Sequence, residues 1–424
     1  MANEIDKPAG PARNRPPFEC IALVLQGGGA LGAYQAGVYE GLAGAGLGPD
    51  WIAGISIGAF NAAIIAGNPP ESRVEKLRQF WRTVTWPTAW SNYWPHGLPN
   101  LQWPMAAWPN AAVLASPAAV PAPLLPSAFD PTLLVKGDAT RGFLNQWSAG
   151  RVLFAGAPGF FEMRPVWPWF QPDGAAGATS YYDTSKLKGT LESLVDFDRI
   201  NGGSMRLSVG AVNVRTGNFA YFDTKRHRIG PEHIMASGAL PPAFPAVEIE
   251  GEHYWDGGLV SNTPLRWVVE SHPQRDTLVF QVDLWSSRGE FPRNMADVNT
   301  RQKEITYSSR TRAASSRFTE MQCVRNSISS LLDKLPPELA DGAETAFLRR
   351  FSERKVWNLI QLIYRAKGYE GDSKDYEFSR QSMEDHWGAG YNDTIRTLRH
   401  PEVLERPRAP DGVFTFDIAE HGRE

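Results

Sequence analysis

A serine lies at the corner between an expected buried strand and an expected helix. The apolar run before it ends at Gly54, and small residues with helical character begin just after Gly58, so Ser56 stands at the turn. In Gly-x-Ser-x-Gly at such a corner, a strained backbone projects the serine hydroxyl from the end of a sheet, above the amides of the next helix. The two glycines let strand and helix approach closely. Ser56 is a candidate nucleophile, although so loose a pattern also occurs by chance.

A glycine-rich stretch, Gln26-Gly27-Gly28-Gly29-Ala30-Leu31-Gly32, follows the continuous apolar run 20–25. A run of this kind is typical of a parallel strand that is covered on both faces. A helix is expected next, because apolar residues recur at intervals of three and four, at Leu31, Tyr34, Val38 and Leu42. The glycines therefore lie between a strand and a helix.

This loop also matches Gly-x-Gly-x-x-Gly, the dinucleotide-binding pattern, and Asp50 lies near the distance of a ribose-binding acid. In a nucleotide fold, however, the acid ends the second strand, whereas Asp50 precedes the strand expected at 51–55. Closely spaced amides at a helix N-terminus are better suited to hold a developing oxyanion. The loop is therefore interpreted as an oxyanion site rather than a nucleotide site.

A serine nucleophile needs a base nearby, and one aspartate is placed to serve. Asp256 is followed by Gly257 and Gly258, which permit a tight turn that can aim its carboxylate. Alone, Asp-Gly-Gly would be only a turn. None of the eight histidines stands in an obvious strand-end turn; those considered are His96, His227, His253 and His386.

Composition sets the class of protein. The chain has 424 residues, 42% of them hydrophobic and 21% charged, with a net charge of −3, so one or two globular domains are expected and a nucleic-acid partner is not. Cys20 and Cys323 lie far apart and match no metal spacing, which favours a reducing compartment. Residues 1–17 lack the apolar centre of a secretory signal, and no segment has the roughly 18 apolar residues of a spanning helix. We expect a disordered lead over 1–19 and a cytoplasmic protein, with peripheral membrane contact left open.

Alternating strands and helices predict a layered α/β domain over about 20–285. After 51–55, the expected elements are strands at 207–214, 219–222, 246–249, 253–255 and 277–282, with helices at 231–238 and 264–271. Residues 290–424 are expected to form a mostly helical region that packs on this domain. Its expected elements are helices at 304–335, 337–354 and 373–398 and a strand-like run at 356–364.

A tryptophan- and proline-rich insertion interrupts the domain at about 81–182. Nine of the fifteen tryptophans lie between Trp81 and Trp169. Because indole favours the boundary between apolar and wet surroundings, part of this insertion could cap an acyl pocket or settle on lipid. The residues considered are Trp86, Trp90, Trp94, Trp103, Met105 and Trp108. A packed, irregular insertion that merely covers the sheet is the alternative.

The three stretches together resemble, in order and spacing, the patatin-like phospholipase family. The segment 236–245 is similar to that family's approach to its aspartate. The resemblance implies a three-layer α/β/α fold and a Ser-Asp dyad without histidine that hydrolyses acyl esters in lipids. Ser56 matches the family nucleophile, Asp256 its base, and Gly28 and Gly29 the amide donors of its oxyanion loop. The pair Ala30-Leu31 departs from the pattern, since many relatives carry a basic residue there.

The site predicted from this resemblance has four parts. They are the dyad Ser56 and Asp256, the oxyanion loop Gly27, Gly28, Gly29 and Gly32, the elbow glycines Gly54 and Gly58, and the turn Gly257-Gly258 that supports the base. No metal or cofactor is implied, and the expected substrate is a phospholipid or another acyl ester.

Two alternative functions stay open, a serine acyltransferase of similar fold and an inactive lipid-binding or scaffold protein. The intact Ser56 and Asp256 argue against the inactive protein. Acyltransferases of similar fold usually place histidine before the elbow serine, where this chain has Ile55.

Overall fold

A nine-stranded sheet forms the centre of the computed structural model, which describes residues 15–87, 138–271, 274–308, 311–336, 339, 341–349, 351–352, 355–407 and 412–417. Six strands run parallel in the order β11-β10-β9-β1-β2-β5. In chain order they are β1 (Cys20–Leu25), β2 (Trp51–Ile55), β5 (Arg206–Asn213), β9 (Thr277–Asp283), β10 (Trp357–Ile363) and β11 (Val413–Phe416). The antiparallel strands β6 (Phe219–Asp223), β8 (Glu252–Asp256) and β7 (Val247–Ile249) extend the sheet from β5.

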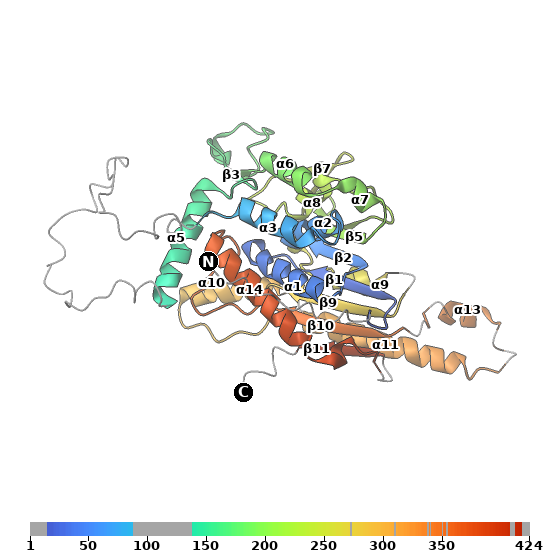
Figure 1. The fold of residues 1–424 in the computed structure, drawn as a ribbon. Coiled ribbons are helices and arrows are strands. Elements are labelled where there is room, and N and C mark those ends of the chain that lie inside the picture. Colours follow the sequence, from blue (N-terminus) through green and yellow to red (C-terminus); the bar gives the residue numbers. More distant parts are fainter. Residues whose placement is uncertain are drawn as a thin grey trace, which may run out of the picture.

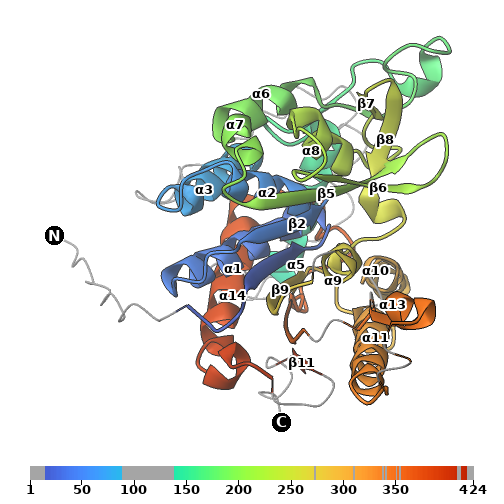
Figure 2. The ribbon, with the colours of Figure 1, turned by 90° about the vertical axis from the view of Figure 1, so that its right-hand side faces the viewer.

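Helices cover both faces of this sheet (Figures 1 and 2). One face carries α1 (Ala33–Gly44), α2 (Ile57–Ala66), α3 (Arg73–Val84) and α14 (Arg380–Thr397), and the other carries α9 (Leu265–Glu270) and α11 (Thr311–Leu332). The remaining elements are α5 (Asp138–Ala155), α6 (Ser185–Leu194), α7 (Phe197–Asn201), α8 (Pro231–Ser237), α10 (Met295–Tyr307), α13 (Ala343–Arg349), the hairpin β3 (Glu162–Met163) and β4 (Tyr182–Asp183), and the single turns η1 (Gly29–Gly32), η4 (Pro168–Phe170), η5 (Gly257–Leu259) and η6 (Pro401–Leu404).

Strand β1 shows why the sheet needs two helical layers. Its side chains alternate between two separate apolar clusters: Leu23 and its like-facing neighbours pack toward α1, α2 and α14, whereas Ala22 and Val24 pack toward α9 and α11. Since successive residues of a strand point to opposite faces, an entirely apolar strand must be buried on both sides. The predicted three-layer α/β/α architecture is confirmed.

Several elements differ from the sequence prediction at their ends. Strand β2 continues to Ile55 and α2 begins at Ile57, so Ser56 alone makes the turn. The helix expected at 304–335 is two helices, α10 and α11, and the helix expected at 373–398 begins only at Arg380. The residues just before Arg380 form a loop that reaches the candidate site.

The C-terminal region shares the sheet of the preceding α/β domain. Strand β10 pairs with β9 along its whole length, and β11 pairs with β10. Helix α14 lies against α1, and the two backbones touch where a Cβ on Gly37 would lie 1.9 Å from the carbonyl oxygen of Trp387. The strand-like run expected at 356–364 is thus part of the central sheet.

Residues 15–19 pack on the domain, with Phe18 buried, while the rest of the lead expected over 1–19 lies outside the described residues. The tryptophans at 90, 94, 103 and 108 lie outside them as well, as does Met105. None of the helices that the structure describes is long and apolar enough to cross a membrane.

The close approach of α1 and α14 predicts a large effect of one methyl group. A Cβ on Gly390 would lie 2.0 Å from the carbonyl oxygen of Tyr34. Gly390→Ala should therefore lower the free energy of unfolding by about 1–3 kcal/mol, as overpacking does. Urea denaturation measures this change.

Gly388, in the same helix, provides the control, because a Cβ there would meet nothing within 4 Å. Gly388→Ala should leave stability unchanged or raise it by about 0.5–1 kcal/mol through helix propensity. Equal stability of the Gly390→Ala variant and the wild type would contradict the close docking of α14 on α1.

Candidate active site

Ser56 stands on a strained turn at the end of β2. Its φ of 53° and ψ of −130° lie in a region that non-glycine residues rarely adopt. The corner is tight: a Cβ on Gly54 would lie 2.3 Å from the carbonyl oxygen of Gly58. A Cβ on Gly58 would lie 2.4 Å from the carbonyl oxygen of Leu25. Glycine is therefore required on both sides of Ser56 for strand and helix to meet.

Ser237 fixes the backbone of this turn. The amide of Ser56 donates to Ser237 Oγ at 3.0 Å, and Ser237 Oγ donates to the carbonyl oxygen of Gly210 at 2.7 Å. Ser237 is fully buried at the end of α8. The chain of hydrogen bonds ties the elbow to strand β5.

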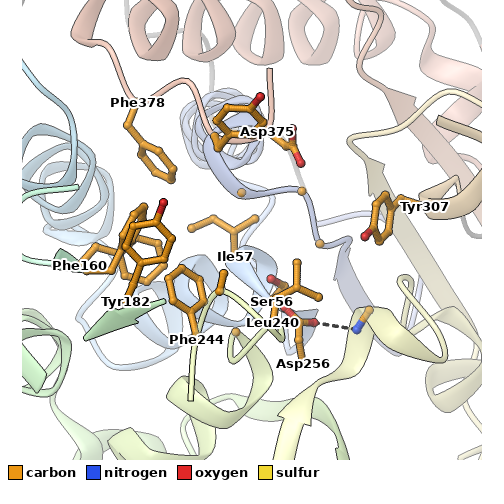
Figure 3. Close-up of a pocket in the computed structure, with 18 of the residues that line it drawn as sticks. Ser56, Ile57, Phe160, Tyr182, Leu240, Phe244, Asp256, Tyr307, Asp375 and Phe378 are labelled. Carbon is orange, nitrogen blue, oxygen red and sulfur yellow. Dashed lines mark hydrogen bonds between the residues drawn. The ribbon is translucent and has the colours of Figure 1, made fainter. Parts of the chain in front are cut away.

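Asp256 is the last residue of β8, and its side chain lies beside Ser56 (Figure 3). The amide of Gly258 donates to Asp256 Oδ1 at 2.7 Å. Burial raises the pKa of Asp256 to about 7, against smaller opposing effects from hydrogen bonds of the Ser56 side chain and the Gly258 amide. A carboxyl with this pKa can accept a proton near neutral pH.

The glycine turn after Asp256 has little free space around it. A Cβ on Gly257 would lie 2.7 Å from the carbonyl oxygen of Gly210, so this residue lets the turn lie against β5. A Cβ on Gly258 would lie 3.1 Å from Asp256 Oδ1. The predicted pair of glycines is thus placed where it keeps the carboxylate in position.

Gly28 and Gly29 line a cavity beside Ser56. Among the described residues, no group accepts a hydrogen bond from either amide. The backbone of Gly29 has φ of 55°, and a Cβ there would lie 2.0 Å from the carbonyl oxygen of Asp375. These two amides are available to a developing negative charge.

The other two glycines predicted for the oxyanion loop have different roles. The amide of Gly27 donates to the carbonyl oxygen of Asn262 at 3.2 Å, and its own carbonyl accepts from Asn262 Nδ2 at 3.0 Å. Its amide is therefore occupied. Gly32 lies deeper, where a Cβ would come within 2.5 Å of the Ile57 side chain. The Gly27 amide is thus bound to Asn262, and Gly32 is not among the residues that line the cavity.

A cavity of about 250 Å³ opens over Ser56 and Asp256. Its wall away from the dyad is largely aromatic, and neighbouring ring centroids such as those of Phe161 and Phe244 lie 5.0 Å apart. The apolar lining consists of Ile57, Val152, Leu153, Phe160, Phe161, Tyr182, Leu240, Ala243, Phe244, Trp285, Tyr307, Tyr376 and Phe378. Such a cavity suits a hydrocarbon chain.

The described part of the cavity wall contains no histidine. His386 is buried elsewhere, where its Nε2 lies 3.0 Å from Glu370 Oε1. His227 accepts from the amide of Asp223 through Nδ1 at 3.2 Å. His96 lies outside the described residues.

The family model "Patatin-like phospholipase" matches residues 23–268, more than half of the chain. The chain belongs to the patatin-like phospholipase family. A second family model, described as "Patatin phospholipase", matches residues 305–410 and so covers most of the C-terminal region of this patatin-like protein.

No curated protein matches the chain. Among solved structures, the chain is similar to VipD from Legionella pneumophila, with 14% sequence identity and a TM-score of 0.36 over 98% of this chain and 77% of that one.

Sequence reasoning missed several residues of the site. Ser237 lies within the segment 236–245, which is similar to the family. A serine outside a motif, however, does not indicate a role in the site. Asn262 contacts the glycine loop through its backbone carbonyl and its Nδ2, and Asp375 contacts it through its backbone carbonyl. Because any residue has a carbonyl, no residue type could reveal the two carbonyl contacts, and an asparagine outside a motif does not indicate its partner.

The buried carboxyl predicts a pH-dependent stability. The folded-state pKa of Asp256 lies above its ordinary value of 3.8, so the folded protein holds this proton more tightly than the unfolded chain does. Its contribution to stability is complete below about pH 4 and is lost as the pH rises through about 7.

Asp256→Asn removes this titration. The variant should therefore gain stability relative to wild type as the pH rises from about 4 to about 7, with no further change above. Thermal unfolding at several pH values measures the difference. A difference that is constant with pH would contradict a buried carboxyl with a raised pKa.

Proposed function

We propose that this protein is a lipid acyl hydrolase that forms an acyl-enzyme on Ser56. The observation that carries the proposal is the buried Asp256 beside Ser56, with its pKa raised to about 7. As Ser56 Oγ attacks the ester carbonyl, Asp256 accepts the hydroxyl proton, and the alcohol leaves with a proton from Asp256. Water then attacks the acyl-enzyme, gives its proton to Asp256, and the carboxylic acid is released as Ser56 regains its proton.

The amides of Gly28 and Gly29 support the tetrahedral intermediate in this proposal. Their N–H groups lie beside the dyad without a partner among the described residues, so they can donate to the oxyanion when it forms. Each oxyanion-hole donor is worth about 10²–10³ in turnover. The aromatic cavity supports a hydrocarbon acyl chain as the part of the substrate that enters.

Substitution of the dyad tests the mechanism. Ser56→Ala and Asp256→Asn should lower hydrolysis of a soluble p-nitrophenyl ester to near background, because the first removes the nucleophile and the second cannot accept a proton. In wild type, kcat/KM should fall as the pH drops below about 7, where Asp256 becomes protonated.

His227→Asn, His253→Asn and His386→Asn are the matched controls and should retain most activity. A histidine variant as inactive as Asp256→Asn would overturn the dyad in favour of a triad. Product analysis with phospholipid vesicles then identifies a free fatty acid if water is the acceptor. Acyl transfer to an added alcohol without release of fatty acid would favour the acyltransferase.

Exposed apolar side chains on α5 and between β3 and β4 support contact with a lipid interface. Leu153 of α5 lines the cavity and is 45% exposed, and its neighbour Phe154 is 76% exposed. In the loop after β3, Trp169 is 79% and Phe170 82% exposed. The loop leads to Tyr182, whose hydroxyl donates to the carbonyl oxygen of Leu153 at 2.9 Å. Exposed aromatic residues on α5, next to Leu153 of the cavity wall, and in the loop that leads to Tyr182 favour an interfacial surface.

A double substitution tests this surface. Trp169→Ala with Phe170→Ala should weaken binding to phosphatidylcholine vesicles by at least about tenfold, because two large apolar side chains are no longer transferred from water into the lipid. Hydrolysis of a soluble ester should stay within about twofold of wild type. Vesicle co-sedimentation and ester turnover measure the two effects.

Phe347→Ala with Phe351→Ala is the matched control, since these exposed rings lie on and just after α13, at the other end of the molecule from α5 (Figure 1). Equal losses of vesicle binding in both double variants would contradict a localised lipid surface.

A further inference from the structure

We propose that the C-terminal segment 372–378 is a working part of the active site, in which Asp375 positions the oxyanion loop and Lys303 fastens Asp375 in place. This inference rests on the proposed hydrolase function and extends it to the region covered by the second family model. It gives the region after the catalytic motifs a role in the reaction itself.

The segment lies directly on the glycine loop. The amide of Ala30 donates to the carbonyl oxygen of Asp375 at 2.7 Å. The same oxygen would be only 2.0 Å from a Cβ on Gly29, so the two backbones are in contact. Because Ala30 follows Gly29 directly, this hydrogen bond holds the peptide next to the proposed oxyanion donors.

The segment also closes one side of the cavity. Asp375, Tyr376 and Phe378 all line it, and Phe378 points into it opposite Phe160 (Figure 3). The far end of the segment is tied down as well, because the amide of Trp86 donates to the carbonyl oxygen of Phe378 at 2.8 Å. Backbone hydrogen bonds thus hold the segment at Asp375 and at Phe378.

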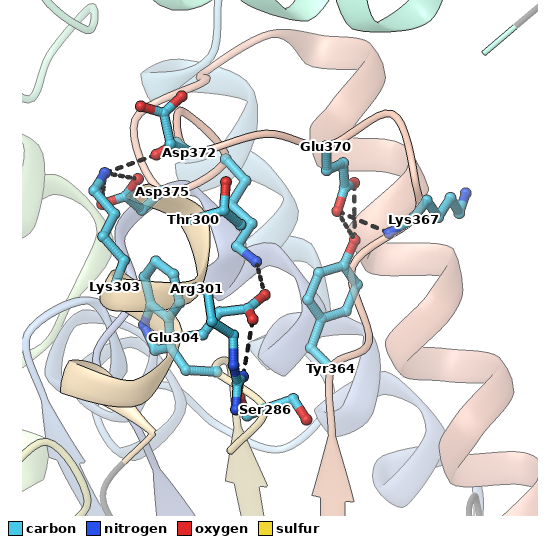
Figure 4. A network of polar contacts seen from close by, with 12 residues as sticks. Ser286, Thr300, Arg301, Lys303, Glu304, Tyr364, Lys367, Glu370, Asp372 and Asp375 are labelled. Carbon is cyan, nitrogen blue, oxygen red and sulfur yellow. Dashed lines mark hydrogen bonds and ion pairs between the residues drawn. The ribbon is translucent and has the colours of Figure 1, made fainter. Parts of the chain in front are cut away.

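Two ion pairs attach this segment to α10 (Figure 4). Lys303 Nζ donates to Asp375 Oδ1 at 2.9 Å and to the carbonyl oxygen of Asp372 at 2.7 Å, so it braces the turn between them. Lys374 Nζ lies 2.7 Å from Glu304 Oε1, and only 3% of its side chain is exposed. In the first pair the lysine belongs to α10, and in the second it belongs to the segment. The two pairs together therefore fix both the position and the direction of the segment.

Loss of Lys303 would affect catalysis through the position of the oxyanion loop. If Lys303 is removed, the Asp375 carboxylate loses its ion-pair partner in a largely buried place, where burial already raises its pKa, and the segment shifts to hydrate it. The hydrogen bond to Ala30 then no longer fixes the loop, and the Gly28 and Gly29 amides lose their alignment with the oxyanion. That loss falls on the transition state, so kcat decreases more than KM changes.

Lys303→Met tests the proposal through turnover of a soluble ester by the full-length protein. We expect kcat to fall by about 10–100-fold, since small misplacements of a catalytic group cost up to about 10² in rate. KM should stay within about threefold, and the acidic limb near pH 7 should not move, because Asp256 is untouched. Lys303→Arg, which keeps the charge, should recover most of the lost kcat.

Lys355→Met is the matched control. Lys355 forms an ion pair with Glu19 at 3.0 Å and has a similarly exposed side chain, 28% against 31% for Lys303, but lies away from the cavity. This variant should keep kcat within about twofold of wild type. Equal kcat in wild type and folded Lys303→Met, or an equal loss in Lys355→Met, would overturn the proposal.

Asp375→Asn and the double variant of Lys303 and Asp375 test the ion pair in two further ways. If Lys303→Met does not fold by circular dichroism, Asp375→Asn removes the same ion pair with less change in shape and should show the same fall in kcat. If both fold, the double variant should be no slower than the slower single variant, because both break one interaction; additive losses would contradict the pairing. Failure of the proposed function is a separate result, seen as the absence of Ser56-dependent turnover in wild type.

Discussion

The burial of one carboxyl group beside one hydroxyl is the constraint on which the rest of the site depends. Asp256 has no cation among the described residues that line the cavity, so water exclusion rather than a neighbouring charge sets its pKa. An aspartate at its ordinary pKa would be a weak base. Burial brings its proton affinity to the level of an imidazole, which explains how the proposed dyad could work without a histidine.

The strained and buried parts of the site are stabilised by rigid neighbours. Ser56 keeps its unfavourable φ because β2 and α2 are fully buried and Ser237 holds its amide. Asp256 keeps its position because β8 pairs with β5 immediately before the turn. The sheet thus brings the ends of two strands together, and it extends without a break into the C-terminal strands β10 and β11. The patatin-like region and the C-terminal region share one core.

The sequence predicted the parts of the site that depend on special residue types. A Cβ on Gly54, Gly58 or Gly257 would lie 2.7 Å or less from a backbone carbonyl oxygen, so glycine is needed at these positions and their spacing carries information. The contact between Ala30 and Asp375 requires no special residue type, since it joins backbone groups that are far apart in the chain, and it could not be predicted from the sequence. The strand-like run at 356–364 was predicted, but its place beside β9 in the central sheet was not, because an isolated apolar run does not reveal its partner strand.

The most direct test of the account is the rate at which a fluorophosphonate modifies Ser56, measured over about pH 5 to 9 in wild type and Asp256→Asn, with peptide mass spectrometry to locate the label. The account predicts a label on Ser56 alone, a wild-type rate that rises through about pH 7, and a slow rate without that rise in Asp256→Asn. A label on another residue, or the same pH-dependent rate in both proteins, would contradict it.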